Sequence, residues 1–250
     1  SLPEIGIASM LTNPDSDIAW FRFESFADPE SIYRVDLNDG STTLWRRPQP
    51  LIDTGDLLVN QVFFTSQDGT QIPMFLIHQR NMVMDGENPT VLYGYGGFDI
   101  SLTPSFIAGW MPWLARGGVY AVANLRGGGE FGADWHRAGM LEKKQNVFDD
   151  FYAAAEWLFD NGYTRAERLG IRGGSNGGLL TGVAITQRPD LFSAAIVAVP
   201  LLDMLRYQHF LMARYWVPEY GSSEILEQFD YIRAYSPYHN IRSGVRYPAT

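Results

Sequence analysis

Short apolar runs alternate with helical segments along residues 90–199, and this alternation restricts the fold more than any other feature of the chain. Strands separated by helices pair in parallel, and helices then cover both faces of the sheet. The sequence therefore predicts an α/β fold with a mainly parallel sheet. The expected strands are 90–93, 118–123, 168–172 and 194–199, and the expected helices are 105–116, 146–160 and 176–187.

Two acidic residues fall inside the expected helix 146–160. Asn146 is expected to cap this helix and Gly162 to end it. Asp149 and Asp150 lie near its start, where they would favour the helix dipole or pair with Arg126. We interpret both carboxylates as structural.

A Gly-x-Ser-x-Gly motif, Gly173 to Gly177, falls between an expected strand and an expected helix. This is the context of a nucleophile elbow, a sharp turn that presents a serine at the carboxyl edge of a parallel sheet. The backbone N–H of Asn176 would then point into the same space and bind an oxyanion. The alternative is a glycine-rich turn in which Ser175 only caps the following helix. The flanking elements favour a catalytic Ser175.

Two further glycine-rich segments need separate interpretations. Residues 94–98 follow the strand at 90–93, which is where hydrolases of this kind take a second oxyanion donor, although a plain loop fits equally well. Residues 127–132 match Gly-x-Gly-x-x-Gly, but no clean helical start follows them and the acidic residues sit inside a helix. We set a dinucleotide site aside.

The first 50 residues have a different pattern, with short strands expected at 17–26, 31–37 and 42–45 and turn residues between them. Three or four strands of this size are typical of one propeller blade. A second hairpin is expected at 57–66 and 71–78. We predict two parts, residues 1–50 as the end of a β-propeller domain and 51–250 as a catalytic α/β-hydrolase domain.

Composition excludes several classes of function. The net charge of −9 argues against a nucleic-acid partner. Cysteine is absent, which excludes thiolate catalysis and cysteine-ligated zinc, and we expect neither a metal nor a cofactor. No run of about 18 apolar residues would span a membrane.

Six motifs in order along the chain together resemble the prolyl oligopeptidase family. They are residues 93–98, 124–130, 144–151, 173–180, 187–192 and 235–240. The resemblance implies an α/β-hydrolase domain capped by a propeller, and cleavage of short peptides on the carboxyl side of proline. Asn176, directly after the serine, favours the prolyl-specific branch over the dibasic-specific and dipeptidyl-releasing relatives.

The resemblance also assigns roles to individual positions. Ser175 would be the nucleophile, with the Tyr95 hydroxyl and the Asn176 N–H as oxyanion donors. Trp216 would stack on the substrate proline. The other residues of the proline pocket (the S1 pocket) would be Phe98, Tyr220, Met212, Val199 and Leu201. Without the resemblance, Trp216 and Tyr220 would be assigned to the core, and Val199 and Leu201 could be ordinary core residues at a strand end. A flat apolar pocket suits proline, which has no N–H to recognise.

The rest of the catalytic triad is not evident. This fold places an acid and then a histidine after the serine, and His209 and His239 are the only histidines there. His239 lies in a segment that resembles a structural one, and His209 precedes Trp216. We therefore expect the chain to be a piece of a longer enzyme, with the aspartate and histidine beyond Thr250, and to be inactive alone.

Two other functions remain open, an esterase or lipase on the same fold and a non-catalytic interaction domain. The propeller-like start and the Trp216 region argue against the esterase. The expected partners are short proline-containing peptides, with neither nucleic acid nor membrane, and the complete protein is expected to be a monomer. The expected location is cytoplasmic, with the periplasm as the alternative.

Overall fold

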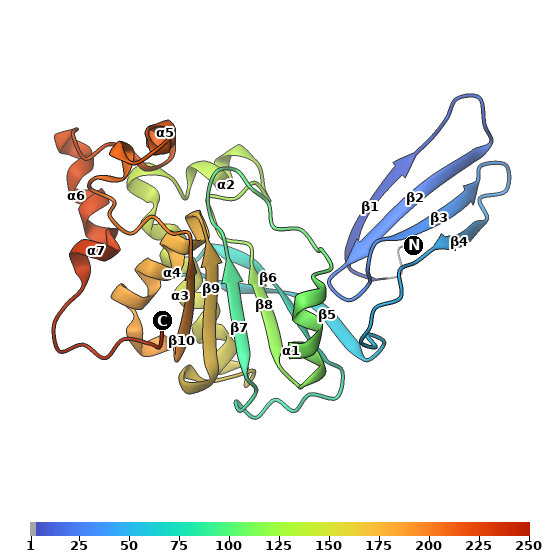
Figure 1. The fold of residues 1–250 in the computed structure, drawn as a ribbon, viewed down its shortest axis with the longest axis horizontal. Helices are drawn as coiled ribbons and strands as arrows, with labels where there is room; N and C mark the ends of the chain where they lie inside the picture. The colour runs from blue at the N-terminus through green and yellow to red at the C-terminus, as the bar shows by residue number, and fades with distance from the viewer. Residues whose placement is uncertain (1–3) are drawn as a thin grey trace. The chain divides into compact units, whose positions relative to one another are not determined.

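The computed structural model describes residues 4–250 (Figure 1). The chain divides into two compact units. The first comprises the chain up to Asn60 with 76–82 and 103–119, and the second comprises 61–75, 83–102 and 120–250. Within the described residues, no helix has the length and apolar character needed to cross a membrane.

An antiparallel sheet occupies the first unit. Its strands are β1 (Gly6–Leu11), β2 (Ile18–Ser25), β3 (Ser31–Asp36) and β4 (Thr42–Arg46), which pair in sequence order. Phe21 faces Tyr33 across β2 and β3, and their rings stack 5.0 Å apart. The sheet matches the meander expected from the sequence. β1 was not predicted, because its side chains are mostly exposed and show no alternation.

The second sheet has six strands in the order β10-β9-β7-β8-β6-β5. Their bounds are β5 (Leu57–Thr65), β6 (Gln71–Gln79), β7 (Thr90–Gly94), β8 (Val119–Ala123), β9 (Leu169–Gly174) and β10 (Ala194–Ala198). β7, β9 and β10 are parallel neighbours, and their arrows point the same way in Figure 1. Parallel strands separated by helices confirm the predicted α/β class with a mainly parallel sheet.

Helices pack against this sheet, and the elements that follow β10 are all helices or 3₁₀ turns. The α-helices are α1 (Met111–Ala115), α2 (Ala133–Arg137), α3 (Gln145–Asp160), α4 (Asn176–Gln187), α5 (Val217–Tyr220), α6 (Leu226–Tyr235) and α7 (Pro237–Asn240). The 3₁₀ turns are η1 (Ala108–Trp110), η2 (Leu141–Lys143), η3 (Ala166–Arg168), η4 (Pro189–Leu191), η5 (Tyr207–His209) and η6 (Ala213–Trp216). α4 packs on β9 and β10, and α3 packs on α4. Buried Phe148, Phe151 and Leu179 belong to this core.

Three local predictions were wrong. Among the described residues Asn146 caps no helix; α3 begins at Gln145, and the Asn146 amide donates a 2.9 Å hydrogen bond to the Ala138 carbonyl. The helix expected at 105–116 is shorter, because Pro112 is accepted only in the first turn of α1. A short helix, α2, does follow the 127–132 loop, although no clean helical start was expected there.

A buried ionic network in the second unit joins three segments. The Arg126 guanidinium pairs with Asp150 of α3 at 2.6 Å and with Asp68 in the turn after β5. Asp150 is fully buried and also accepts a hydrogen bond from Ser66. This confirms the pairing expected for Asp150. Asp149 instead accepts a 2.9 Å hydrogen bond from Gln145.

Candidate active site

Ser175 occupies a sharp turn between β9 and α4. Its φ of 58° and ψ of −120° lie in a region that residues other than glycine rarely adopt. The backbone around it is held, because the Ser175 N–H donates to the Ala198 carbonyl at 3.1 Å and the Gly178 N–H donates to the Ser175 carbonyl at 2.9 Å. Within residues 4–250 the Ser175 hydroxyl caps no helix, and the residue is exposed. The turn therefore presents the hydroxyl to solvent.

Two glycines make this turn possible by close approach. A Cβ on Gly173 would overlap the Gly177 carbonyl, so the chain can pass itself only without a side chain there. A Cβ on Gly178 would lie 2.6 Å from the Ala198 carbonyl oxygen, which is inside van der Waals contact. These glycines therefore let α4 begin directly against the sheet.

A cavity of about 190 Å³ opens beside Ser175. Phe98 forms edge-to-face contacts with Trp216 and Tyr220, with ring centroids 6.5 and 5.6 Å apart. Flat aromatic walls of this kind accept a small apolar ring. The lining residues are Tyr95, Phe98, Ile100, Ser175, Leu201, Trp216 and Tyr220.

The structure thus brings together six of the residues singled out in the sequence and leaves three outside the lining. Met212 and Val199 are 62% and 80% exposed, and Asn176 is buried and is not among the residues that line the cavity. Ile100 was missed, although it lies only two residues after Phe98 in the same loop. The roles of all these residues stay predictions.

The Asn176 side chain connects the elbow to the cavity wall. Its amide donates to the Tyr95 carbonyl, and its oxygen accepts a 2.7 Å hydrogen bond from the Tyr220 hydroxyl. Burial raises the pKa of Tyr220 well above its usual value, so the phenol stays protonated and can donate. As the first residue of α4, Asn176 has a backbone N–H that no helical carbonyl can reach, which leaves it free for an oxyanion.

A buried ionic cluster lies behind the cavity wall. Glu219 of α5 faces Lys144 at 3.4 Å and His136 at 2.7 Å. Lys144 also donates a 2.8 Å hydrogen bond to the Gly96 carbonyl. Burial lowers the pKa of Lys144 to about 8, with Glu219 acting in the opposite direction. These groups were not singled out as site residues, because their spacing along the chain gives no sign that they meet.

The two histidines after the serine are engaged elsewhere. His209 is exposed and lies 3.2 Å from Glu224, and the His239 ring nitrogen lies 2.8 Å from the Ser236 hydroxyl. Neither histidine lines the cavity at Ser175. That neither histidine acts as the catalytic base stays a prediction.

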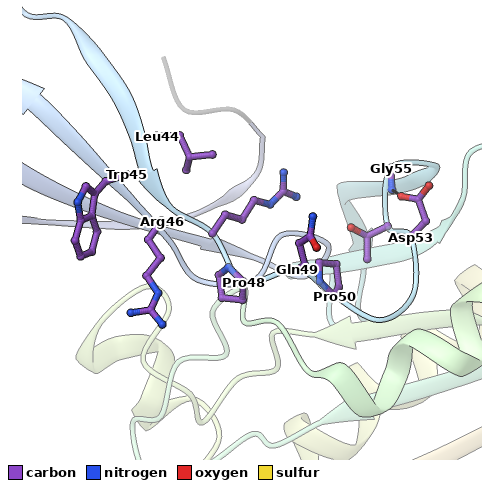
Figure 2. A pocket seen from close by; sticks show the side chains of 10 residues that line it. Leu44, Trp45, Arg46, Pro48, Gln49, Pro50, Asp53 and Gly55 are labelled. Atoms are coloured by element: carbon purple, nitrogen blue, oxygen red, sulfur yellow. Dashed lines mark hydrogen bonds between the residues drawn. The ribbon is translucent and has the colours of Figure 1, made fainter.

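Two larger cavities are not lined by Ser175. One of about 740 Å³ in the first unit lies along the end of β4 and the linker that follows, as Figure 2 shows. Its residues include Trp45, Arg46, Pro48 and Asp53, with no strained serine. Another, of about 430 Å³, is lined mainly by apolar side chains of α4, β10 and α7. Size alone therefore does not identify the reactive site.

The strand, the strained serine and the following helix at the carboxyl edge of a parallel sheet define the α/β-hydrolase fold with its nucleophile elbow. The prolyl oligopeptidase family model matches residues 104–250, more than half of the chain, and the chain belongs to this family.

Relatives and solved structures agree with this assignment. The chain is 44% identical to the prolyl endopeptidase of Elizabethkingia meningoseptica over 92% of its length and 33% of that protein. A structure from a study of two prolyl endopeptidases superimposes with a TM-score of 0.93 at 52% identity, covering 100% of this chain and 37% of that one. A post-proline cleaving enzyme from Rickettsia typhi gives a TM-score of 0.90 at 39% identity over 97% and 35%. The chain spans about a third of the length of the curated relatives it matches.

Proposed function

We propose that this chain supplies the nucleophile, the oxyanion donors and the proline pocket of a serine peptidase that cleaves short peptides on the carboxyl side of proline. The observation that carries the proposal is the aromatic cavity beside the strained Ser175. Relatives named prolyl endopeptidase support the choice of substrate.

In the proposed reaction a general base takes the proton of the Ser175 hydroxyl, the Ser175 oxygen attacks the carbonyl carbon of proline, and the same proton is later given to the leaving amine. The carbonyl oxygen becomes an oxyanion, which accepts hydrogen bonds from the Tyr95 hydroxyl and the Asn176 N–H. The carbon–nitrogen bond then breaks, the amine leaves with a proton, and an acyl-enzyme forms on Ser175. Water releases the peptide acid in a second attack.

The cavity favours proline for a physical reason. Phe98, Trp216 and Tyr220 offer ring faces and edges to the pyrrolidine ring, and proline requires no acceptor for a backbone N–H. Each methylene buried in such a pocket contributes about 1–3 kcal/mol of discrimination. We therefore expect proline to be preferred over alanine by about 100-fold or more in kcat/KM.

The 250 residues alone are proposed to turn over little substrate. Within the part of the chain that the structure describes, no histidine lines the cavity at Ser175, and none there is proposed to accept the serine proton. Losing part of a triad costs about 10⁴–10⁶ in kcat.

The test uses the full-length natural protein and a pair of chromogenic peptides that differ only in proline or alanine before the reporter. The wild type is expected to cleave the proline peptide preferentially, and Ser175→Ala is expected to lose about 10⁴-fold or more of that activity. Equal cleavage of both peptides, or activity that survives Ser175→Ala, would refute the proposal. An ester without proline that reacts as well as the proline peptide would favour an esterase instead.

A further inference from the structure

Glu219 lies where two distant parts of the cavity wall meet. The loop after β7 carries Tyr95 and Phe98, and the consecutive elements η6 and α5 carry Trp216 and Tyr220. Glu219 belongs to α5, is only 4% exposed, and is not among the residues that line the cavity. It therefore lies behind the wall and has no direct contact with a bound substrate.

The Glu219 carboxylate joins this helix to the loop directly. One oxygen accepts a 3.1 Å hydrogen bond from the Phe98 N–H and faces the Lys144 ammonium at 3.4 Å. The other oxygen lies 2.7 Å from the His136 ring nitrogen. Lys144 continues to the loop through its 2.8 Å hydrogen bond to the Gly96 carbonyl, and its ammonium lies 5.3 Å from the Tyr220 ring centroid.

The loop needs such support because its conformation is unfavourable. Phe98 and Asp99 have φ values of 59° and 58°, and a residue other than glycine held in this region costs about 1–3 kcal/mol. Strain of this kind persists only where neighbouring groups hold it. Glu219 supplies one such contact, because its carboxylate accepts the Phe98 N–H from α5, 121 positions later in the chain.

We propose that Glu219 is a positioning residue that fixes Phe98 against Trp216 and Tyr220, directly through the Phe98 N–H and indirectly through Lys144, and so sets the selectivity of the pocket for proline. The proposal rests on the proposed proline-specific peptidase. It adds that selectivity depends on a buried side chain that never touches the substrate.

The chemistry of the cluster supports this role. Lys144 has a pKa of about 8 and is mostly protonated at neutral pH, so it compensates the buried Glu219 carboxylate. A carboxylate that accepts a backbone N–H and faces a cation has a defined position, because charge-assisted hydrogen bonds are the stronger ones. Removing it frees the loop and the helix to move apart.

The test compares kcat/KM for the proline and alanine peptides in the full-length natural protein. Their ratio is unaffected by the fraction of protein that is folded, since both peptides meet the same enzyme. Glu219→Ala is expected to lower this ratio by about tenfold or more, because small displacements of a binding wall have effects of this size. Glu219→Gln keeps an oxygen that can accept the Phe98 N–H, so this variant is expected to keep most of the wild-type preference for the proline peptide.

The matched control is Glu227→Ala on α6, whose side chain is exposed and which is expected to leave the ratio within twofold of wild type. If Glu219→Ala does not fold, Lys144→Met removes the hydrogen bond to the Gly96 carbonyl and the cation that faces Glu219, and it must lower the ratio by itself. An unchanged ratio in whichever of these variants folds overturns the role of Glu219. A wild type without preference for proline overturns the proposed function instead, so the two failures are distinguishable.

Discussion

The Tyr220 hydroxyl donates a 2.7 Å hydrogen bond to the side-chain oxygen of Asn176, the residue directly after the candidate nucleophile. Both side chains are buried, at 0% and 1% exposure. A hydrogen bond therefore joins the cavity wall to the nucleophile elbow, and we expect a substitution at Tyr220 to shift Asn176.

Tyr220→Phe keeps the ring and removes this donor. The Asn176 oxygen is then buried without its partner, which costs about 1–3 kcal/mol, and the melting temperature is expected to fall by several degrees. We also expect kcat to fall severalfold, because the Asn176 amide holds the Tyr95 carbonyl. Tyr207→Phe is the matched control, since its buried hydroxyl donates to the Gly221 carbonyl and not to Asn176. It should lower the melting temperature and leave kcat unchanged; equal kcat values in both variants would contradict the connection.

Trp216 and Met212 were both assigned to the proline pocket from the sequence. In the structure Trp216 lines the cavity, whereas Met212 does not. Trp216→Ala removes a ring that lines the cavity, and kcat/KM for a proline peptide is expected to fall about 10- to 100-fold. Met212→Ala truncates a side chain that is 62% exposed and is expected to change kcat/KM less than threefold. A larger loss for Met212→Ala than for Trp216→Ala would show that the bound peptide meets a different wall.

Lys144 predicts a pH dependence of stability. Its pKa of about 8 in the folded protein is below the 10.5 of an exposed lysine, so the unfolded chain binds the extra proton between these values. Stability contributed by this group therefore rises with pH across that window, by about 2 kcal/mol between pH 7 and pH 9.5. Thermal melts of wild type and Lys144→Met at both pH values measure this as a difference. A melting temperature that responds to pH equally in both proteins would contradict the assignment.

Asp150 and Arg126 form a pair that is 0% and 5% exposed. Asp150→Asn leaves the guanidinium buried with only Asp68 as a charged partner, and breaking a buried pair costs about 3–5 kcal/mol. We expect a loss of about 10 °C in melting temperature. Asp149→Asn, one position earlier and outside this network, serves as the control and should change the melting temperature by no more than about 2 °C. Similar shifts in the two variants would argue against the network.

The sequence predicted the strand and helix order of the α/β part because the apolar runs and glycine turns are local signals. Ser175 was singled out as the candidate nucleophile for the same reason, since strand, turn and helix are contiguous at the elbow. Met212 and Val199 were placed in the pocket by resemblance, but side-chain direction depends on tertiary packing, and Val199 has a φ of 38° that no pattern foretells. Glu219 and Lys144 escaped detection because they meet only after folding, 75 positions apart.

The glycines around Ser175 restrict which substitutions related proteins can accept at this turn. A Cβ at Gly173 would strike the Gly177 carbonyl, whereas an alanine at position 175 would fit the space that the serine already fills. In a related protein without the proposed activity, the serine can therefore be replaced while the glycines are still required for the turn. Descendants in which this turn survives without its serine would be folded proteins with a vacant reaction centre, available for recognition rather than cleavage.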